Sequence, residues 1–344
     1  MDASGVFFTH HAHDRSLVRT WPQAAALALL LAALALAPLF LPERWVSLGY
    51  AMFITAIAVI GLQVCTGYAG QVNLGQSAFM GVGAYACALL LHNPHVPVLL
   101  ALVAGGACAA GFGVLFGLTA ARIKGFYLAL TTIAAQAIFH FLVLNLPASW
   151  LGGAGGLHLE KLTLLGVPLD QDRNIYWLSL TVLVVMTAGA FGIVRSRHGR
   201  SFQAIRDDDV AAGMMGIAVA ATKVRAFLVA AFFAGVAGGL WAISLRHVSV
   251  EQFTLFNSIW MIAMMIIGGL VIYPALYAIH VSTLNKGMTK FVGLANFTFL
   301  FTRETFWMVV WQSCVFAITA LVLKALIGFI VARFVHTIPA KGQR

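Results

Sequence analysis

The chain has 344 residues, of which 61% are hydrophobic and only 9% are charged, and its mean hydropathy is +0.93. Soluble domains carry about one quarter charged residues, so this composition excludes a soluble globular protein and indicates an integral membrane protein. The formal net charge is +10, but the basic residues gather at the ends of apolar runs, as they do in cytoplasmic loops of membrane proteins. Nucleic-acid binding is therefore not predicted.

The apolar runs predict eight or nine transmembrane helices in one all-α bundle, because each is near the ~20 residues that cross a bilayer as a helix. The first run is long, rich in Leu and Ala, and lacks a clear cleavage site before the next, so we interpret it as a helix and not as a secretory signal. The predicted spans are 21–41, 46–66, 75–91, 96–121, 126–146, 175–194, 226–245, 254–279 and 305–335.

The distribution of Lys and Arg assigns the predicted loops to the two sides of the membrane. Basic residues occur in the amino-terminal residues 1–20, in the turn at 122–124 and throughout the segment 195–225. The positive-inside rule places these three parts in the cytoplasm, so the segment 146–174 faces outward. On composition alone, 195–225 is either an ordinary basic loop or a surface that contacts a partner.

The acidic residues and the missing nucleotide motif limit the possible energy sources. All eleven acidic residues lie outside the predicted spans, whereas ion-coupled carriers usually keep a carboxylate within the membrane; such a carrier is disfavoured, although backbone carbonyls can hold sodium. The dipeptide Gly-Lys does not occur, so the chain has no phosphate-binding P-loop. If ATP powers this protein, another polypeptide binds it.

No catalytic residue, cofactor or metal site is predicted. Neither HExxH, nor paired carboxylates, nor a Ser/His/Asp set lies on a helix face. The four cysteines fall within apolar spans at spacings that match neither a zinc site nor a disulfide framework, and the histidines near residue 10 are interpreted as part of a solvated tail.

The segment 195–225 has the pattern of a docking surface. Residues 201–206 can form an amphipathic turn, and the acidic run 207–209 offers a helix start, where negative charge complements the helix dipole. The side chains that would fill a groove on a partner are apolar: Phe202, Met214, Met215 and Ile217.

The order of residues in this segment resembles the coupling loop of the LivM-type permeases of branched-chain amino acid ABC importers. In that family the loop docks into the ATPase, so the resemblance implies the same role here. Val210 stands where the generic motif has Glu, and Gly213 where many relatives carry a polar residue. The candidate coupling residues that match are Gly199, Arg200, Ile205, Arg206, Asp207, Ala211, Ala212, Gly216 and Ile217.

Two further stretches, 67–85 and 124–132 with 152–157, resemble the early and middle signatures of the same family, so the resemblance covers about residues 46–269. Glycines in the early signature permit a broken helix, which membranes tolerate where backbone lines a cavity. Tight packing through small residues is the alternative, and both interpretations stay open. The candidate residues of a translocation path are Gly67, Gly70, Gln71, Asn73, Gly75, Gln76 and Ser77.

After Gly269 the sequence departs from this family, and residues 270–344 resemble the amino-terminal part of MalF-type sugar permeases. The predicted domains are therefore a cytoplasmic tail at 1–20, a LivM-like permease domain at 21–269 and a divergent segment at 270–344. The two resemblances give the run 254–279 opposite directions. A turn at Gly268 and Gly269 would make a re-entrant hairpin, because an arm of about 12 residues rises only ~18 Å within a core of ~30 Å.

The resemblance implies a permease subunit of an ABC importer for branched-chain or other hydrophobic amino acids, in the bacterial inner membrane. The implied partners, besides the lipid bilayer, are ABC ATPase subunits, a second LivH-like permease and a periplasmic substrate-binding protein. The alternatives are a fusion product that inserts without transporting, and an importer of other small amides or amino acids.

Overall fold

The computed structural model describes residues 21–93, 96–123, 125–147, 151–159, 163–164, 167–268, 307–308 and 311. The chain divides into two compact units, Met1–Ile267 and Gly268–Arg344, and nearly all described residues belong to the first. The predicted tail 1–20, nearly all of the predicted span 305–335 and the second part of 254–279 lie outside the described residues. So does almost the whole segment that resembles a sugar permease.

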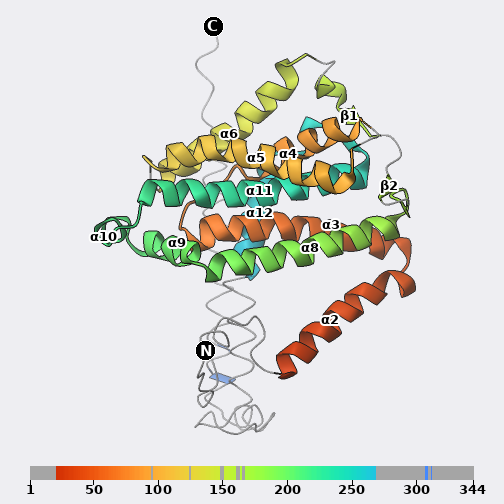
Figure 1. Ribbon diagram of the computed structural model, residues 1–344, viewed down its shortest axis with the longest axis horizontal. Helices are drawn as coiled ribbons and strands as arrows, with labels where there is room; N and C mark the ends of the chain where they lie inside the picture. The colour runs from red at the N-terminus through yellow and green to blue at the C-terminus, as the bar shows by residue number, and fades with distance from the viewer. Residues whose placement is uncertain are drawn as a thin grey trace. The chain divides into compact units, whose positions relative to one another are not determined.

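The first unit is a bundle of helices, in which α3, α8 and α11 run side by side and α11 also packs on α4 and α5 (Figure 1). The long helices are α2 (Trp21–Phe40), α3 (Glu43–Leu62), α5 (Val98–Ala120), α6 (Phe126–Asn145), α8 (Asp172–Arg195) and α11 (Val219–Leu245). The shorter ones are the π-helix η1 (Gln63–Tyr68), α4 (Gln76–Leu91), η2 (Gly153–Gly155), α9 (Arg197–Asp207), α10 (Asp209–Met214), η3 (Val250–Gln252) and α12 (Leu255–Ile266).

Five helices of the described residues are long and apolar enough to cross a membrane: α3 together with η1, α5, α6, α8 and α11. The apolar stretches in α2, α4 and the segment around α12 are shorter. These helices confirm the predicted class, a polytopic all-α bundle, and most spans fall within a few residues of their predicted positions. The exception is α11, which begins at Val219 and not at 226.

Helix α11 forms the centre of the bundle. In its most apolar stretch 78% of the residues are buried, against 28–44% in the other four long helices. Glycines let its backbone touch its neighbours: a Cβ added at Gly83 of α4 would overlap the backbone of Gly235, and one added at Gly238 would overlap the carbonyl oxygen of Met80. This is the close approach that small residues allow between membrane helices.

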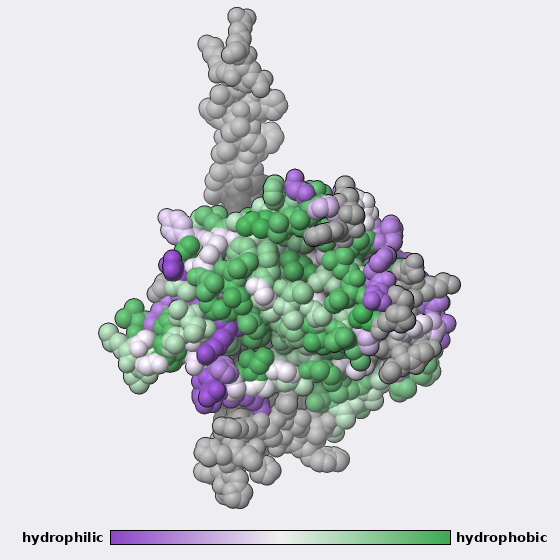
Figure 2. All heavy atoms as spheres, turned by 45° about the horizontal axis from the view of Figure 1, so that its top comes forward, coloured by the Kyte–Doolittle hydropathy of each residue, from purple (hydrophilic) through white to green (hydrophobic). Residues whose placement is uncertain are grey.

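The two ends of the bundle differ in composition. At one end, which we call the strand end, β1 (Leu157–His158) pairs antiparallel with β4 (His247–Val248), and β2 (Thr163–Leu164) pairs with β3 (Val167–Pro168). At the other, the basic end, α9 and α10 connect α8 to α11. Hydrophilic residues gather on opposite sides of Figure 2, with a broad apolar surface between them.

The described Lys and Arg residues are unevenly divided between these ends. The strand end carries Arg44, Arg173 and Arg246. The basic end carries Arg122, Arg195, Arg197, Arg200, Arg206, Lys223 and Arg225.

Candidate functional site

The predicted coupling segment folds into two short helices at the basic end. Helix α8 ends at Arg195, and the Ser196 hydroxyl oxygen accepts the backbone N–H of His198 at 3.1 Å, which caps the start of α9. The predicted amphipathic turn is a complete amphipathic helix of 11 residues. Its apolar face buries Phe202, which is 1% exposed, so the prediction that Phe202 fills a partner's groove is wrong; it anchors α9 to the bundle instead.

The acidic run 207–209 is divided between the two helices. Asp207 is the last residue of α9. The Asp208 carboxylate accepts the backbone N–H groups of Val210 at 2.7 Å and Ala211 at 3.2 Å, and so caps α10. Asp209 lies in the first turn of α10. Two of the three acids therefore occupy the predicted helix start.

A buried ion pair ties α10 to the central helix. Lys223 Nζ lies 2.6 Å from Asp209 Oδ2, and the two side chains are 1% and 13% exposed. Lys223 was expected in the polar loop, but it belongs to α11, because the Asp209 carboxylate provides the partner that a buried ammonium requires. Removing one partner of a buried pair typically costs about 3–5 kcal/mol, so the position of α10 is strongly fixed relative to α11.

The tip of α10 presents apolar side chains away from the bundle. Met214 and Met215 are each 83% exposed, and Val210 is 63% exposed. The chain then turns at Gly216, whose φ is +82°. Exposed apolar groups next to a charged helix are typical of a surface that a partner covers.

The other predicted coupling residues divide by orientation. Those buried against the bundle are Gly199, Ile205 and Ala212. Those exposed are Arg200, Arg206, Asp207, Ala211 and Gly216, and Ile217 is half-buried.

Arg206 connects this helix pair to the glycine-rich early signature. Its Nη1 donates a hydrogen bond to the carbonyl oxygen of Gly67 at 2.9 Å. At Gly70, where φ is +67°, an added Cβ would lie 2.8 Å from Arg206 Cγ. Two motifs 139 residues apart in sequence are thus in direct contact. Arg206 was expected to contact a partner, and its guanidinium also binds the backbone of its own chain.

The early signature is a break between two helices. Helix α3 widens into the π-turns of η1, the backbone leaves the helix after Tyr68, and α4 begins at Gln76. Asn73 and Gln76 are fully buried, and Gln71 is 6% exposed. Buried polar groups in such a position must find partners within the protein.

The polar side chains of the break satisfy these requirements among themselves and with the backbone. Asn73 Nδ2 donates to Gln76 Oε1 at 2.9 Å, and Asn73 Oδ1 accepts the N–H of Gly75 at 2.9 Å. Gln76 Nε2 donates to the carbonyl oxygen of Ala58 in α3 at 2.8 Å. Gln71 Nε2 donates to the carbonyl oxygen of Ala69 at 2.9 Å, so Gln71, Asn73 and Gln76 hold the break together.

Ser77 differs from these three residues. It is fully buried, its Oγ has no hydrogen-bond partner among the described residues, and it lines a cavity of about 320 Å³, which we call the Ser77 cavity. Of the polar side chains in the predicted path, those of Gln71, Asn73 and Gln76 form hydrogen bonds, whereas Ser77 lines a cavity and its buried Oγ has no partner among the described residues.

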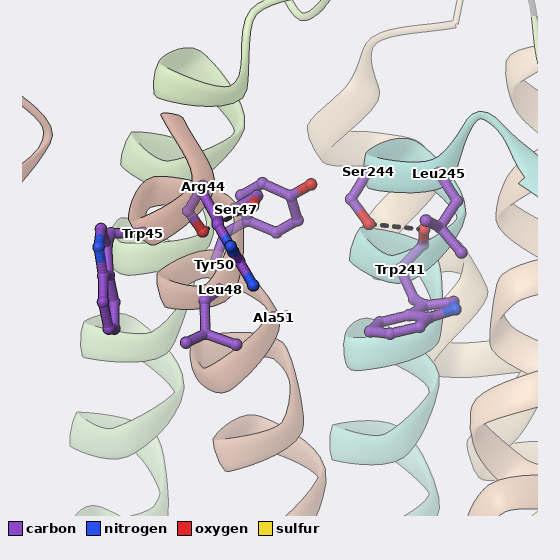
Figure 3. A pocket seen from close by; sticks show the side chains of 9 residues that line it. All are labelled: Arg44, Trp45, Ser47, Leu48, Tyr50, Ala51, Trp241, Ser244 and Leu245. Atoms are coloured by element: carbon purple, nitrogen blue, oxygen red, sulfur yellow. Dashed lines mark hydrogen bonds between the residues drawn. The ribbon is translucent and has the colours of Figure 1, made fainter. Parts of the chain in front are cut away.

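Two further hollows lie along the same face of the bundle and share Trp241 with the Ser77 cavity. One, of about 440 Å³, lies between α3 and Trp241. The other, of about 680 Å³, lies toward the strand end, where Arg44 and Tyr50 of α3 face Trp241 and Ser244 of α11 (Figure 3). Leu48 and Ala51 line both of these hollows. Thr55 and Met264 line both the 440 Å³ hollow and the Ser77 cavity. The three hollows therefore form one groove along α3, α11 and α12.

Sequence reasoning missed the contribution of α12 to this groove. The predicted run 254–279 begins one residue before α12, which starts at Leu255, but no role was predicted for Asn257 and Ser258 in the first turn of this helix. The sequence signal that could have indicated this contribution is the presence of polar residues near the start of an apolar run. The hydrogen bond between Ser258 and Ser77 of α4 joins residues 181 positions apart, which no local pattern predicts.

Membrane-spanning helices around a central helix, a broken helix inside the bundle and a helix pair exposed at the basic end define a polytopic membrane permease. The chain belongs to the family described as "Branched-chain amino acid transport system / permease component", whose model matches residues 45–294. The three motifs lie within this region, so the resemblance to LivM-type permeases is confirmed. The matched region also extends past Gly269.

Individual relatives agree with this family. The high-affinity branched-chain amino acid transport system permease protein LivM of Escherichia coli (strain K12) is 31% identical over 291 residues, which cover 78% of this chain and 68% of the relative. The LivM protein of Salmonella typhimurium (strain LT2) gives the same values. No solved structure matches the chain.

Proposed function

We propose that this protein is the membrane-spanning subunit of an ATP-driven importer that moves branched-chain or other hydrophobic amino acids into the cell. The observation that carries the coupling part of this proposal is the helix pair α9 and α10. It presents Met214 and Met215 outward, and it is tied to the central helix by the pair of Lys223 and Asp209. Because the exposed face of this helix pair is apolar and its inner side is attached to α11, it can transmit movement of a bound ATPase to the transmembrane helices.

The sidedness of the proposal follows from charge. Most described basic residues lie at the basic end, and Lys and Arg accumulate on the cytoplasmic side of membrane proteins. We therefore place α9, α10 and the tail 1–20 in the cytoplasm of a bacterial cell, and the strand end outside the inner membrane. In this orientation α10 meets cytoplasmic ATPase subunits, and the strand end meets a periplasmic substrate-binding protein.

The coupling path has two branches. Movement of a partner against α10 reaches α11 through Asp209 and Lys223, which lie 2.6 Å apart. Movement of α9 reaches the helix break through the hydrogen bond from Arg206 to Gly67. Both branches end at helices that line the groove beside Trp241, where a second, LivH-like permease would complete the path.

We assign this transport role to the domain 21–269. The family match includes residues 270–294, and the segment 270–344 is proposed as a more divergent part that resembles the start of a sugar permease. A rival function follows from that resemblance: a fusion product that inserts in the membrane and couples to no ATPase. The two possibilities differ in whether the full chain, with its partners, takes up leucine.

Both points are tested by co-expressing the tagged full chain with the ATPase subunits, the second permease and the binding protein. We expect the ATPases to co-purify, and expect Met214→Glu combined with Met215→Glu to abolish their capture. Gln203→Glu, which adds a charge at an exposed position on α9, should leave capture unchanged. Unchanged capture by the methionine variant would overturn the docking role, and absence of leucine uptake by the wild-type complex would favour the fusion product or another substrate.

A further inference from the structure

The Ser77 cavity lies where two helices begin. Helix α4 starts at Gln76 and α12 at Leu255, and the backbone N–H of Ser77 donates to Ser258 Oγ at 2.9 Å, so their first turns are in contact. The N-terminus of a helix carries a partial positive charge that favours anions. Two such ends on one cavity make it favourable for a carboxylate.

The wall of the cavity at the start of α4 is deeply buried, since Ser77 and Gln76 are both 0% exposed. Gln76, next to Ser77, donates through Nε2 to the carbonyl oxygen of Ala230 at 3.4 Å. Ala230 is near the middle of α11, which runs over Val219–Leu245. Since α11 is long enough to span the membrane, the cavity lies near the bilayer midplane, a depth at which carriers with broken helices hold their substrates.

Two residues that line the cavity, Ser77 and Gln252, each have a buried side-chain oxygen, Oγ and Oε1, without a hydrogen-bond partner among the described residues. Ser77 itself is fully buried. Gln252 is held in place because its Nε2 donates to the carbonyl oxygen of His247 at 3.3 Å and its own carbonyl oxygen accepts from Asn257 Nδ2 at 2.7 Å. A buried polar atom without a hydrogen-bond partner raises the free energy of the folded state, so a polar ligand that supplied the missing hydrogen bonds would be favoured here.

The two oxygen atoms have different chemistry. A serine hydroxyl can donate to a carboxylate, whereas an amide oxygen only accepts, and so suits an ammonium group. The rest of the wall is apolar and adaptable, with Met80, Trp241 and Met264 among its side chains. Methionines fill irregular space around varied aliphatic shapes.

We propose that the Ser77 cavity is a transit site for one zwitterionic α-amino acid with an aliphatic side chain. The carboxylate lies at the Ser77 hydroxyl and the starts of α4 and α12, the ammonium at Gln252 Oε1, and the side chain against Met80, Trp241 and Met264. A volume of about 320 Å³ is at the small end of the ~300–1,000 Å³ typical of ligand sites, which fits a single small molecule. The site rests on the importer function proposed above and gives that function a binding step inside the membrane.

The test uses the full chain assembled with its partners in proteoliposomes, with radiolabelled leucine as the probe. Ser77→Ala should lower the initial uptake rate about tenfold, because a hydrogen bond to a charged group is lost, and Gln252→Leu should do the same. Ser179→Ala is the matched control, since Ser179 is also fully buried with an Oγ that has no partner among the described residues, but it lies on α8 away from this cavity. Its uptake should equal that of the wild type.

A second variant tests shape. Met261→Trp fills part of the cavity that Met261 lines, so it should reduce leucine uptake more than valine uptake. Co-purification of the ATPases serves as the control that each variant assembles. If Ser77→Ala does not assemble, Gln252→Leu and Met261→Trp carry the test. A wild-type complex without leucine uptake would overturn the importer function itself. Normal uptake by assembled Ser77→Ala and Gln252→Leu, with unchanged preference in Met261→Trp, would overturn the transit site alone.

Discussion

The helix pair α9 and α10 and the helix break at 69–75 deviate from their surroundings in opposite ways. The helix pair exposes methionines at the basic end, where polar groups are expected, and its Asp209 pairs with the buried Lys223 of α11. The break and the start of α4 bury Asn73, Gln76 and Ser77 fully within the apolar bundle. Each arrangement costs free energy unless something compensates it. Hydrogen bonds within the protein satisfy the buried polar side chains of this region except Ser77. The exposed methionines at the tip of α10, in contrast, can be covered only by another molecule.

The contact from Arg206 to Gly67 joins these two regions. It allows a comparison of their roles: changes in the helix pair should disturb partner capture, and changes in the break should disturb the fold and the transport path. The following predictions separate the two, starting with the largest expected effect.

Replacing Lys223 with Met should destabilise the protein by about 3–5 kcal/mol, because Asp209, 13% exposed, loses its buried cation. Thermal unfolding in detergent measures the loss, and ATPase capture should fall with it. The double variant Lys223→Met with Asp209→Leu should recover most of the stability, because buried pairs are often replaceable by apolar side chains. Arg225→Met, at an exposed position on the same helix, is the control; an equal loss in both single variants would contradict the ion pair's role.

Replacing Gly70 with Ala should destabilise the protein by about 1–2 kcal/mol, the cost of a left-handed backbone for a residue with a Cβ. The new Cβ would also press on Arg206 Cγ at 2.8 Å and separate α9 from the break. Unfolding in detergent and leucine uptake should both decline. Gly111→Ala is the matched control, because a Cβ there meets nothing within 4 Å, and its stability should be equal or slightly higher. Similar behaviour of the two variants would remove the argument for strain at Gly70.

Replacing Arg206 with Ala should change stability by only about 1 kcal/mol, since one hydrogen bond is lost from a side chain that is 52% exposed. Leucine uptake should fall several-fold while membrane insertion and ATPase capture persist, because the branch from α9 to the break is cut and α10 remains attached through Asp209. The measurement is the ratio of leucine transported to ATP hydrolysed. An unchanged ratio would show that Arg206 has no part in coupling.

Replacing Asp208 with Ala should lower the stability by about 1 kcal/mol, because α10 loses its N-cap, and its effect on transport should be smaller than that of Arg206→Ala. Uptake should decrease slightly, with the unfolding temperature as the primary readout. Asp207→Ala, at an exposed helix end, should be nearly neutral. The opposite order of effects would mean that the acidic run starts its helix one residue earlier than the structure places it.

Sequence patterns predicted the spans well because a bilayer requires long apolar helices with internally satisfied backbones. They also predicted the helix start at Asp208 and Asp209, since capping depends on neighbours within three residues. They failed for Lys223, whose burial depends on Asp209, 14 residues earlier. They also failed for Phe202, because a local pattern does not distinguish the helix face that meets the bundle from the one that meets a partner.

The candidate path shows the same limit. The motif 67–77 contains four polar side chains that local sequence cannot separate. Gln71, Asn73 and Gln76 form hydrogen bonds, whereas Ser77 lines a cavity and its Oγ has no partner among the described residues. That difference depends on α11 and α12, which lie more than 140 residues further along the chain.

The glycine contacts between α4 and α11 determine which parts of the bundle can shift. Backbone touches backbone at Gly83 with Gly235, and at Gly238 with Met80, so no side chain is available there to change rotamer and accommodate sliding. Displacement by one helical turn, about 5.4 Å, would bring larger residues into these contacts. Helices α4 and α11 must therefore travel as a single rigid body.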